Sequence, residues 1–137
     1  MNGPERFEQL IAFLGSQLPQ PVDQHDAGDG TIVFTAGEPG EVIVELSEQS
    51  VVVSEYAGAW GVDGFVVKPH RVGLLKWRRL PETAVMNALT SLIKGAREMR
   101  LARYRACRLC GASTAPEWML ADQLCHRCTE PQSDVVH

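Results

Sequence analysis

The chain has 137 residues, of which 45% are hydrophobic and 22% are charged, and its formal net charge is −4. These values are typical of a folded globular protein and exclude a chain that is mostly disordered. No run of 18 apolar residues occurs, and the first residues lack the basic and then apolar order of a signal peptide. We therefore expect a cytoplasmic protein with no membrane partner.

The charges are divided unevenly along the chain. Residues 1–67 contain eleven acidic side chains and one basic one, whereas residues 68–137 contain twelve basic and six acidic ones. Such a division can indicate an acidic or nucleic-acid partner. It can equally indicate that the two halves attract each other, and we favour this second interpretation.

The first predicted element is a helix. Pro4 suits a first helical position, and Pro19 ends the pattern. Between them, apolar residues recur at the spacing of an amphipathic helix: Phe7, Leu10, Ile11, Leu14 and Leu18. Residues 19–30 are rich in proline, glycine and aspartate, so we expect a loop there.

From Thr31 onward the apolar pattern favours strands. Residues 31–35, 41–46 and 51–56 are predicted strands, and the short turns between them predict an antiparallel meander. The glycines of residues 57–64 should take the chain out of the sheet, and residues 65–67 are a candidate fourth strand. Residues 70–80 fit neither the helical nor the strand period.

A second long helix is predicted over residues 83–106. It follows Pro81 and carries the apolar stripe Val85, Leu89, Leu92, Ala96 and Met99. We expect it to pack on the sheet up to about Met99 and then to project, because a continuing helix would bring Arg100 and Arg103 onto or near the stripe. The predicted fold class is therefore α+β, with a domain over residues 1–103 and a tail over residues 104–137.

The tail carries all four cysteines. They form two C-x2-C pairs separated by fourteen residues, Cys107 with Cys110 and Cys125 with Cys128. Two thiolates at this spacing bind one ion from a tight turn, and a second pair completes a tetrahedron around Zn²⁺. Gly111 permits the left-handed turn that such a pair needs. Four protein ligands leave no open position, so we expect one structural zinc ion.

On these residues the tail resembles a zinc ribbon, as found at the C-termini of small uncharacterised bacterial proteins. The resemblance covers about residues 104–131 and implies a metal module, but it specifies no activity. Iron in a rubredoxin-like site, a thioredoxin-like pair and disulfides are alternatives that the sequence favours less. Residues 1–100 resemble no family that we can name.

Basic residues precede and enter the first cysteine pair. On a helix continuing through residue 106 and beyond, Lys94, Arg97, Arg105 and Arg108 would share one face. This stretch, residues 94–108, either compensates the negative zinc–thiolate charge or binds phosphates of a nucleic acid. Trp118, between the two pairs, is either a stacking platform for an unpaired base or part of a small core.

Three functions remain open from the sequence. The leading hypothesis is a non-catalytic zinc-binding protein that acts as a protein-interaction or adaptor module. The first alternative is a nucleic-acid-binding protein that uses Lys94, Arg97, Arg105, Arg108 and Trp118. The second is an enzyme with a site near Trp60 and His70 and a purely structural zinc. No nucleotide fingerprint or nucleophile motif occurs. The sequence does not predict the oligomeric state.

Overall fold

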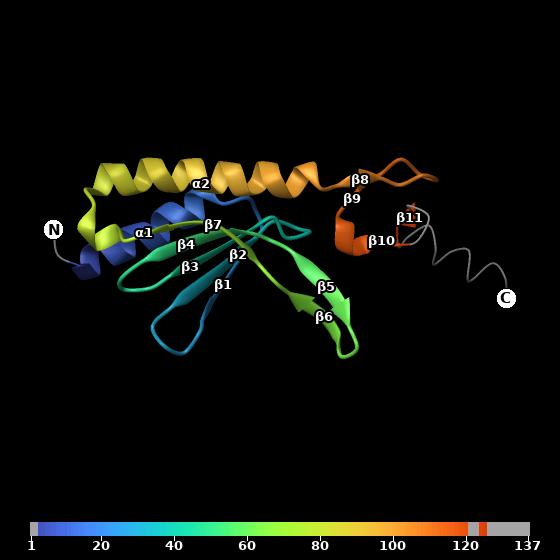
Figure 1. Cartoon of the computed structure of the whole chain (residues 1–137). Coiled ribbons are helices and arrows are strands. Elements are labelled where there is room, and N and C mark those ends of the chain that lie inside the picture. Colours follow the sequence, from blue (N-terminus) through green and yellow to red (C-terminus); the bar gives the residue numbers. More distant parts are fainter. Residues whose placement is uncertain (1–2, 121–123, 126–137) are drawn as a thin grey trace.

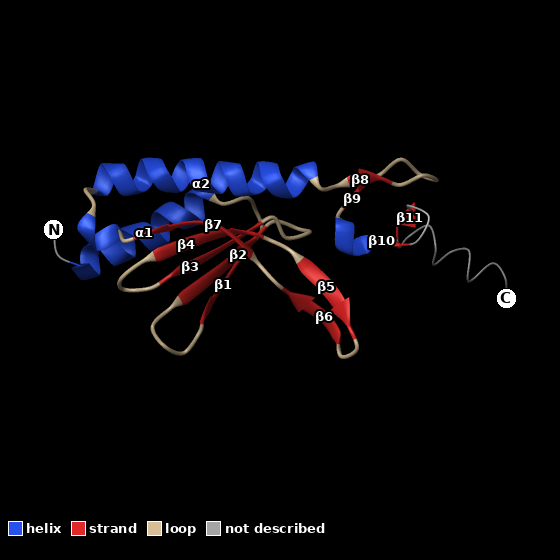
Figure 2. Cartoon of the chain, in the orientation of Figure 1, coloured by secondary structure: helices blue, strands red, loops and turns tan. Residues whose placement is uncertain are grey.

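A computed structural model describes residues 3–120 and 124–125 of the chain. Its main layer is a five-stranded antiparallel sheet in the order β1-β2-β3-β4-β7 (Figures 1 and 2). These strands are β1 (Val22–Asp26), β2 (Ile32–Ala36), β3 (Val42–Leu46), β4 (Val51–Glu55) and β7 (His70–Leu75). Helices α1 (Gly3–Gln17) and α2 (Glu82–Ala102) form the second layer. The predicted α+β class is confirmed.

The core lies between the sheet and the two helices. Phe34, Val44 and Val53 are directly opposite one another on β2, β3 and β4, and all three are completely buried. Leu14 of α1 and Leu89 of α2 pack into the same cluster. Alternate positions of the strands, such as Val42, Val44 and Leu46 of β3, therefore face the helices, although Ile43 between them is also buried.

The predicted meander is confirmed for β2, β3 and β4, but the two flanking strands, β1 and β7, were not predicted from the sequence. β1 lies within the predicted loop 19–30, and four of its five residues are exposed. β7 occupies part of the ambiguous stretch 70–80 and pairs with β4 across an irregularity between Val53 and Ser54. A 3-10 turn (Trp77–Arg79) follows β7 and buries Trp77 completely.

The glycine-rich segment leaves the main sheet, as predicted. β5 (Gly58–Gly61) and β6 (Gly64–Val67) form a separate two-stranded hairpin that extends beyond the sheet (Figure 1). The candidate strand 65–67 therefore pairs with β5 rather than with the meander. A Cβ at Gly58 would lie 2.2 Å from the ring of Phe65, so any larger residue there would force that ring to move.

The second helix is shorter than predicted, and its buried face is rotated. α2 ends at Ala102 instead of residue 106, with Arg103 as its C-cap. Met99 is 44% exposed, whereas Arg100 is 1% exposed. The predicted stripe is therefore wrong in its last turn, because Arg100 finds a charged partner in the tail that the helical period cannot show.

The tail consists of short elements beyond α2. β8 (Arg105–Ala106) pairs with β9 (Ser113–Thr114), and β10 (Met119–Leu120) pairs with β11 (Leu124–Cys125). A 3-10 turn (Pro116–Trp118) lies between the two hairpins. No helix within residues 3–120 is long and apolar enough to cross a membrane.

Candidate functional site

The first cysteine pair lies in a tight turn between β8 and β9. The amide of Gly111 donates to the carbonyl of Cys107 at 2.8 Å, and the amide of Cys107 donates to the carbonyl of Ala112 at 2.9 Å. Gly111 has a φ of +75°, which is the left-handed conformation predicted for it. Cys107 is buried and Cys110 is exposed.

The second pair is only partly described. Cys125 is opposite Met119 in the β10–β11 hairpin, and Cys128 lies outside the described residues. Within the described part of the chain, no group of three or more histidine, cysteine, aspartate or glutamate side chains gathers as metal ligands do.

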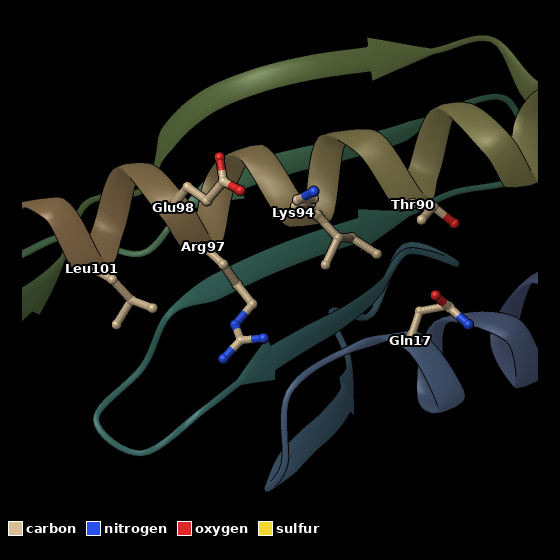
Figure 3. A pocket seen from close by; sticks show the side chains of 7 residues that line it. Gln17, Thr90, Lys94, Arg97, Glu98 and Leu101 are labelled. Atoms are coloured by element: carbon tan, nitrogen blue, oxygen red, sulfur yellow. The ribbon is translucent and has the colours of Figure 1, made fainter.

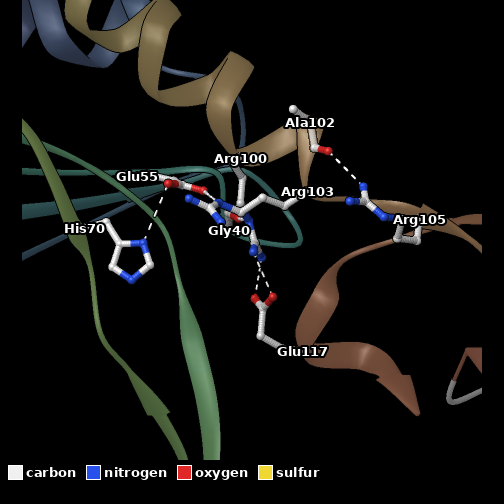
Figure 4. A network of polar contacts seen from close by, with 8 residues as sticks. All are labelled: Gly40, Glu55, His70, Arg100, Ala102, Arg103, Arg105 and Glu117. Atoms are coloured by element: carbon white, nitrogen blue, oxygen red, sulfur yellow. Dashed lines mark hydrogen bonds and ion pairs between the residues drawn. The ribbon is translucent and has the colours of Figure 1, made fainter. Parts of the chain in front are cut away.

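A buried ion pair fastens the tail to the body of the protein. Arg100 donates from Nη1 to Oε2 of Glu117 at 2.7 Å and from Nη2 to Oε1 of the same carboxylate (Figure 4). The side chains are 1% and 3% exposed. Arg100 also donates from Nε to the carbonyl of Gly40 at 2.8 Å and lies over the rings of Tyr56 and Tyr104.

The surroundings of Arg100 keep it charged. Burial disfavours the guanidinium charge, but the hydrogen bonds and charge of Glu117 outweigh burial, so the pKa of Arg100 is raised above its ordinary value. Tyr104 and Tyr56 contribute in the same direction. The pair thus remains ionic although it is out of contact with water.

The two phenols beside Arg100 are perturbed by the same cluster. Burial raises the pKa of Tyr56, and the charge of Glu117 adds to this effect while Arg100 opposes it. Burial also raises the pKa of Tyr104, against the opposing charge of Arg100 and with help from Glu41 and Glu117. Both phenols therefore hold their protons more tightly in the folded chain than in the unfolded one.

This predicts a loss of stability at high pH. Above the unfolded tyrosine pKa of about 10, the unfolded chain loses phenolic protons first, so the free energy of unfolding falls as the pH rises through the folded pKa values. Below pH 10 this contribution is constant. Denaturant unfolding of the double variant Tyr56→Phe and Tyr104→Phe should show a smaller fall between pH 9.5 and 11 than the parent. An equal fall in both proteins would contradict the assignment.

An aromatic cluster reinforces the contact between tail and body. The Trp118 ring stacks on Phe65 with centroids 5.9 Å apart, and Trp60 meets it edge-on at 5.4 Å. Nε1 of Trp60 donates to the carbonyl of Glu117 at 2.9 Å. Trp118 thus packs against the β5–β6 hairpin, which supports the core interpretation of this residue over the stacking platform.

A pocket of about 640 Å³ opens where the end of α2, the start of β7 and the tail meet. Its wall combines basic and apolar side chains from these elements: Ala57, Gly58, His70, Met99, Arg100, Ala102, Arg103, Arg105, Pro116 and Glu117. Behind it, the Glu55 carboxylate is completely buried; Oε2 accepts from Nε of Arg103 at 2.5 Å, and Oε1 lies 3.7 Å from Nδ1 of His70 (Figure 4).

The residues predicted to bind nucleic acid do not share one face. Lys94 and Arg97 lie on α2 beside a hollow of about 350 Å³ (Figure 3), and Arg97 is paired with Glu41 at 2.6 Å. Arg105 lies in β8, and Arg108 lies in the cysteine turn. The predicted continuous helical face is therefore wrong, because α2 ends before Arg105.

The ion pairs Arg97–Glu41 and Arg103–Glu55 join the basic second half of the chain to its acidic first half. The preferred interpretation of the charge division, attraction between the halves, is supported by this pairing. Sequence reasoning missed Glu55 and Glu117, which carry no motif. Two features of the sequence could have pointed to them. Glu55 follows the apolar pattern of β4, and Arg100 falls on the apolar stripe of α2, where a charged residue needs a partner.

Comparison of the chain with protein-family models, with curated proteins and with solved structures finds no match.

Proposed function

We propose that the protein is a non-catalytic, zinc-binding interaction protein. One Zn²⁺ ion, held by Cys107, Cys110, Cys125 and Cys128, organises the tail. The surface formed by the tail and the β5–β6 hairpin then binds a protein partner. The spacing of the cysteines supports the metal, and the distribution of exposed apolar side chains supports the partner.

The backbone of the first cysteine turn fits a zinc-binding pair. Its left-handed Gly111 and its two short-range hydrogen bonds hold the chain in the turn that brings two thiolates three residues apart to one ion. β10 and β11 offer a second hairpin for the second pair. When bound, a four-thiolate zinc ion cross-links the two hairpins and supplies folding energy to a segment too small for a core of its own.

The observation that carries the interaction hypothesis is the clustering of exposed apolar residues. Four of the eight large apolar side chains that are exposed in the described residues lie on the β5–β6 hairpin: Trp60, Val62, Val66 and Val67. Three more lie at the end of α2 and in the cysteine turn: Met99, Leu101 and Leu109. A concentration of exposed apolar side chains on one hairpin is typical of a protein-binding site.

The charges around this surface indicate the chemistry of the partner. Lys68 follows β6 directly, and Arg105 and Arg108 lie in the adjoining tail; all three are exposed. Only Asp63, at the tip of the hairpin, adds a negative charge within residues 57–68. The partner we expect is therefore a protein segment that presents apolar side chains flanked by acidic ones.

The double variant Val62→Asp and Val66→Asp tests this surface. Val62 is fully exposed and Val66 is 46% exposed, so the fold should tolerate both changes, whereas two carboxylates would oppose an apolar and acidic partner. In affinity capture from the native cell, we expect at least about a tenfold loss of the captured protein, since hot-spot changes typically cost 2 kcal/mol or more.

The matched control is Asn87→Asp with Ser91→Asp, which adds the same charge to an exposed face of α2. It should capture as much protein as the parent after nuclease treatment. Equal capture by the hairpin variant and the parent would exclude this surface. Capture that disappears on nuclease treatment would favour the nucleic-acid alternative instead.

A further inference from the structure

We propose that the pocket beside the end of α2 binds a small molecule that carries a phosphate group. This proposal goes beyond the proposed function, because it concerns a different ligand, although Met99 and Arg105 border both surfaces. The pocket volume of about 640 Å³ is in the range of small-molecule sites. The charge, the hydrogen-bond donors and the apolar side chains of its wall indicate the class of ligand.

The wall has an excess of positive charge. Arg100, Arg103 and Arg105 face two carboxylates, Glu117 in the wall and Glu55 behind it. Three guanidinium groups against two carboxylates leave one positive charge in surplus. An anionic group is therefore the ligand that this wall balances.

Two of the arginines have donors available for a ligand. Arg103 uses Nε for Glu55 and is 50% exposed, and its two terminal nitrogen atoms have no carboxylate partner among the described residues. Arg105 donates from Nη1 to the carbonyls of Ala102 and Tyr104, each at 3.0 Å, and forms no ion pair with the described acids. Guanidinium groups bind phosphate oxygens through pairs of N–H donors.

The buried Glu55 carboxylate positions one of these arginines. Its Oε2 atom accepts from Nε of Arg103, which leaves the terminal nitrogen atoms of that guanidinium for a ligand. Its Oε1 atom is buried and forms no hydrogen bond within the described part of the chain, which is costly for a carboxylate oxygen. The imidazole of His70 lies beside Oε1, with Nδ1 at 3.7 Å, and adds a ring nitrogen to the wall of the pocket. Glu55 is thus a positioning residue for Arg103.

The rest of the wall suits an organic phosphate better than inorganic phosphate. Ala57, Met99 and Pro116 offer apolar contacts next to the arginines. A phosphate monoester can fill both the charged and the apolar parts of the pocket, whereas the free ion uses only the charged part.

The test is calorimetric titration of the full-length protein as purified with phenyl phosphate, inorganic phosphate and benzoate. We expect phenyl phosphate to bind most tightly of the three. Arg105→Gln should weaken its binding about tenfold, because one charge-assisted hydrogen bond is lost while the ion pairs of Arg100 and Arg103 remain. Arg79→Gln removes the same charge from an exposed site elsewhere and should leave the affinity unchanged.

Three outcomes would overturn the proposal. Absence of phenyl phosphate binding at millimolar concentration would exclude the site. Equal weakening by Arg105→Gln and Arg79→Gln would show general charge attraction only. If benzoate bound as tightly as phenyl phosphate, the pocket would have no preference for phosphate over carboxylate, and the proposed ligand class would be wrong. None of these results bears on partner capture by the β5–β6 hairpin, so the two proposals fail separately.

Discussion

Replacing Glu117 by glutamine should weaken the docking of the tail by about 3–5 kcal/mol, because it leaves the Arg100 charge buried without a counter-charge. The free-energy cost of burying an unpaired Arg100 charge can be avoided if the tail detaches, because Arg100 then becomes solvated. We therefore expect the tail of the Glu117→Gln variant to detach at a denaturant concentration well below that at which the body unfolds.

The three tryptophans of the chain allow this to be measured. Trp60 and Trp118 lie at the junction of tail and body, whereas Trp77 is completely buried in the core. Detachment should expose the half-buried Trp118 and break the hydrogen bond of Trp60 to Glu117, so the fluorescence of both should change. Far-ultraviolet circular dichroism should continue to report a folded body.

Two variants serve as controls. Arg97→Gln removes the exposed ion pair with Glu41 and should cost at most about 1 kcal/mol. The double variant Arg100→Met and Glu117→Met replaces both charges by apolar groups and should recover much of the lost stability, since an apolar pair of similar volume often matches a buried ion pair. Coincident unfolding of tail and body in Glu117→Gln, at the parent midpoint, would contradict the role given to this pair.

Loss of the metal should unfold the tail and leave the body folded. In zinc-finger peptides the apparent binding energy of zinc is about 10–16 kcal/mol, and it stabilises a segment that has no sufficient core of its own. The buried apolar cluster of the body is built from α1, Leu18, α2, the main sheet and Trp77, with no member among the described residues of the tail. A Cys110→Ser variant should therefore keep most of its helical signal.

The same variant should lose the interactions that depend on the docked tail. The fluorescence of Trp60 and Trp118 should change as in Glu117→Gln, and the wall formed by Pro116 and Glu117 should no longer close the pocket. Ser113→Ala changes an exposed residue of the β8–β9 hairpin and is the matched control, which should bind metal as the parent does. Cooperative unfolding of the whole Cys110→Ser chain would show instead that tail and body share one folding unit, and that the predicted boundary at residue 103 is wrong.

The periodic elements were the predictable part of the fold. β2, β3, β4 and both helices follow from apolar spacing, because each buries one face against the same core. β1 was missed because it is an edge strand with a polar, exposed sequence, which no apolar alternation marks. β7 was missed because the irregularity in its pairing with β4 interrupts the period of two.

The candidate site was predictable only where spacing along the chain carries the information. The C-x2-C spacing and Gly111 predict the cysteine turn because all its parts lie within five residues. The pairing of Arg100 with Glu117 joins residues 17 apart, and Arg103 with Glu55 joins residues 48 apart, so no local pattern reports them. α2 ends at Ala102, next to these contacts, so the predicted basic face of the helix was too long.

The metal content of the freshly purified, full-length protein tests the account most directly. We predict one zinc ion per chain and, after replacement by cobalt, the absorption of a four-sulfur tetrahedral site that is lost in Cys110→Ser. A protein that contains intact disulfides and no metal, or a cobalt spectrum unchanged in Cys110→Ser, would contradict the zinc site at the centre of the proposed function.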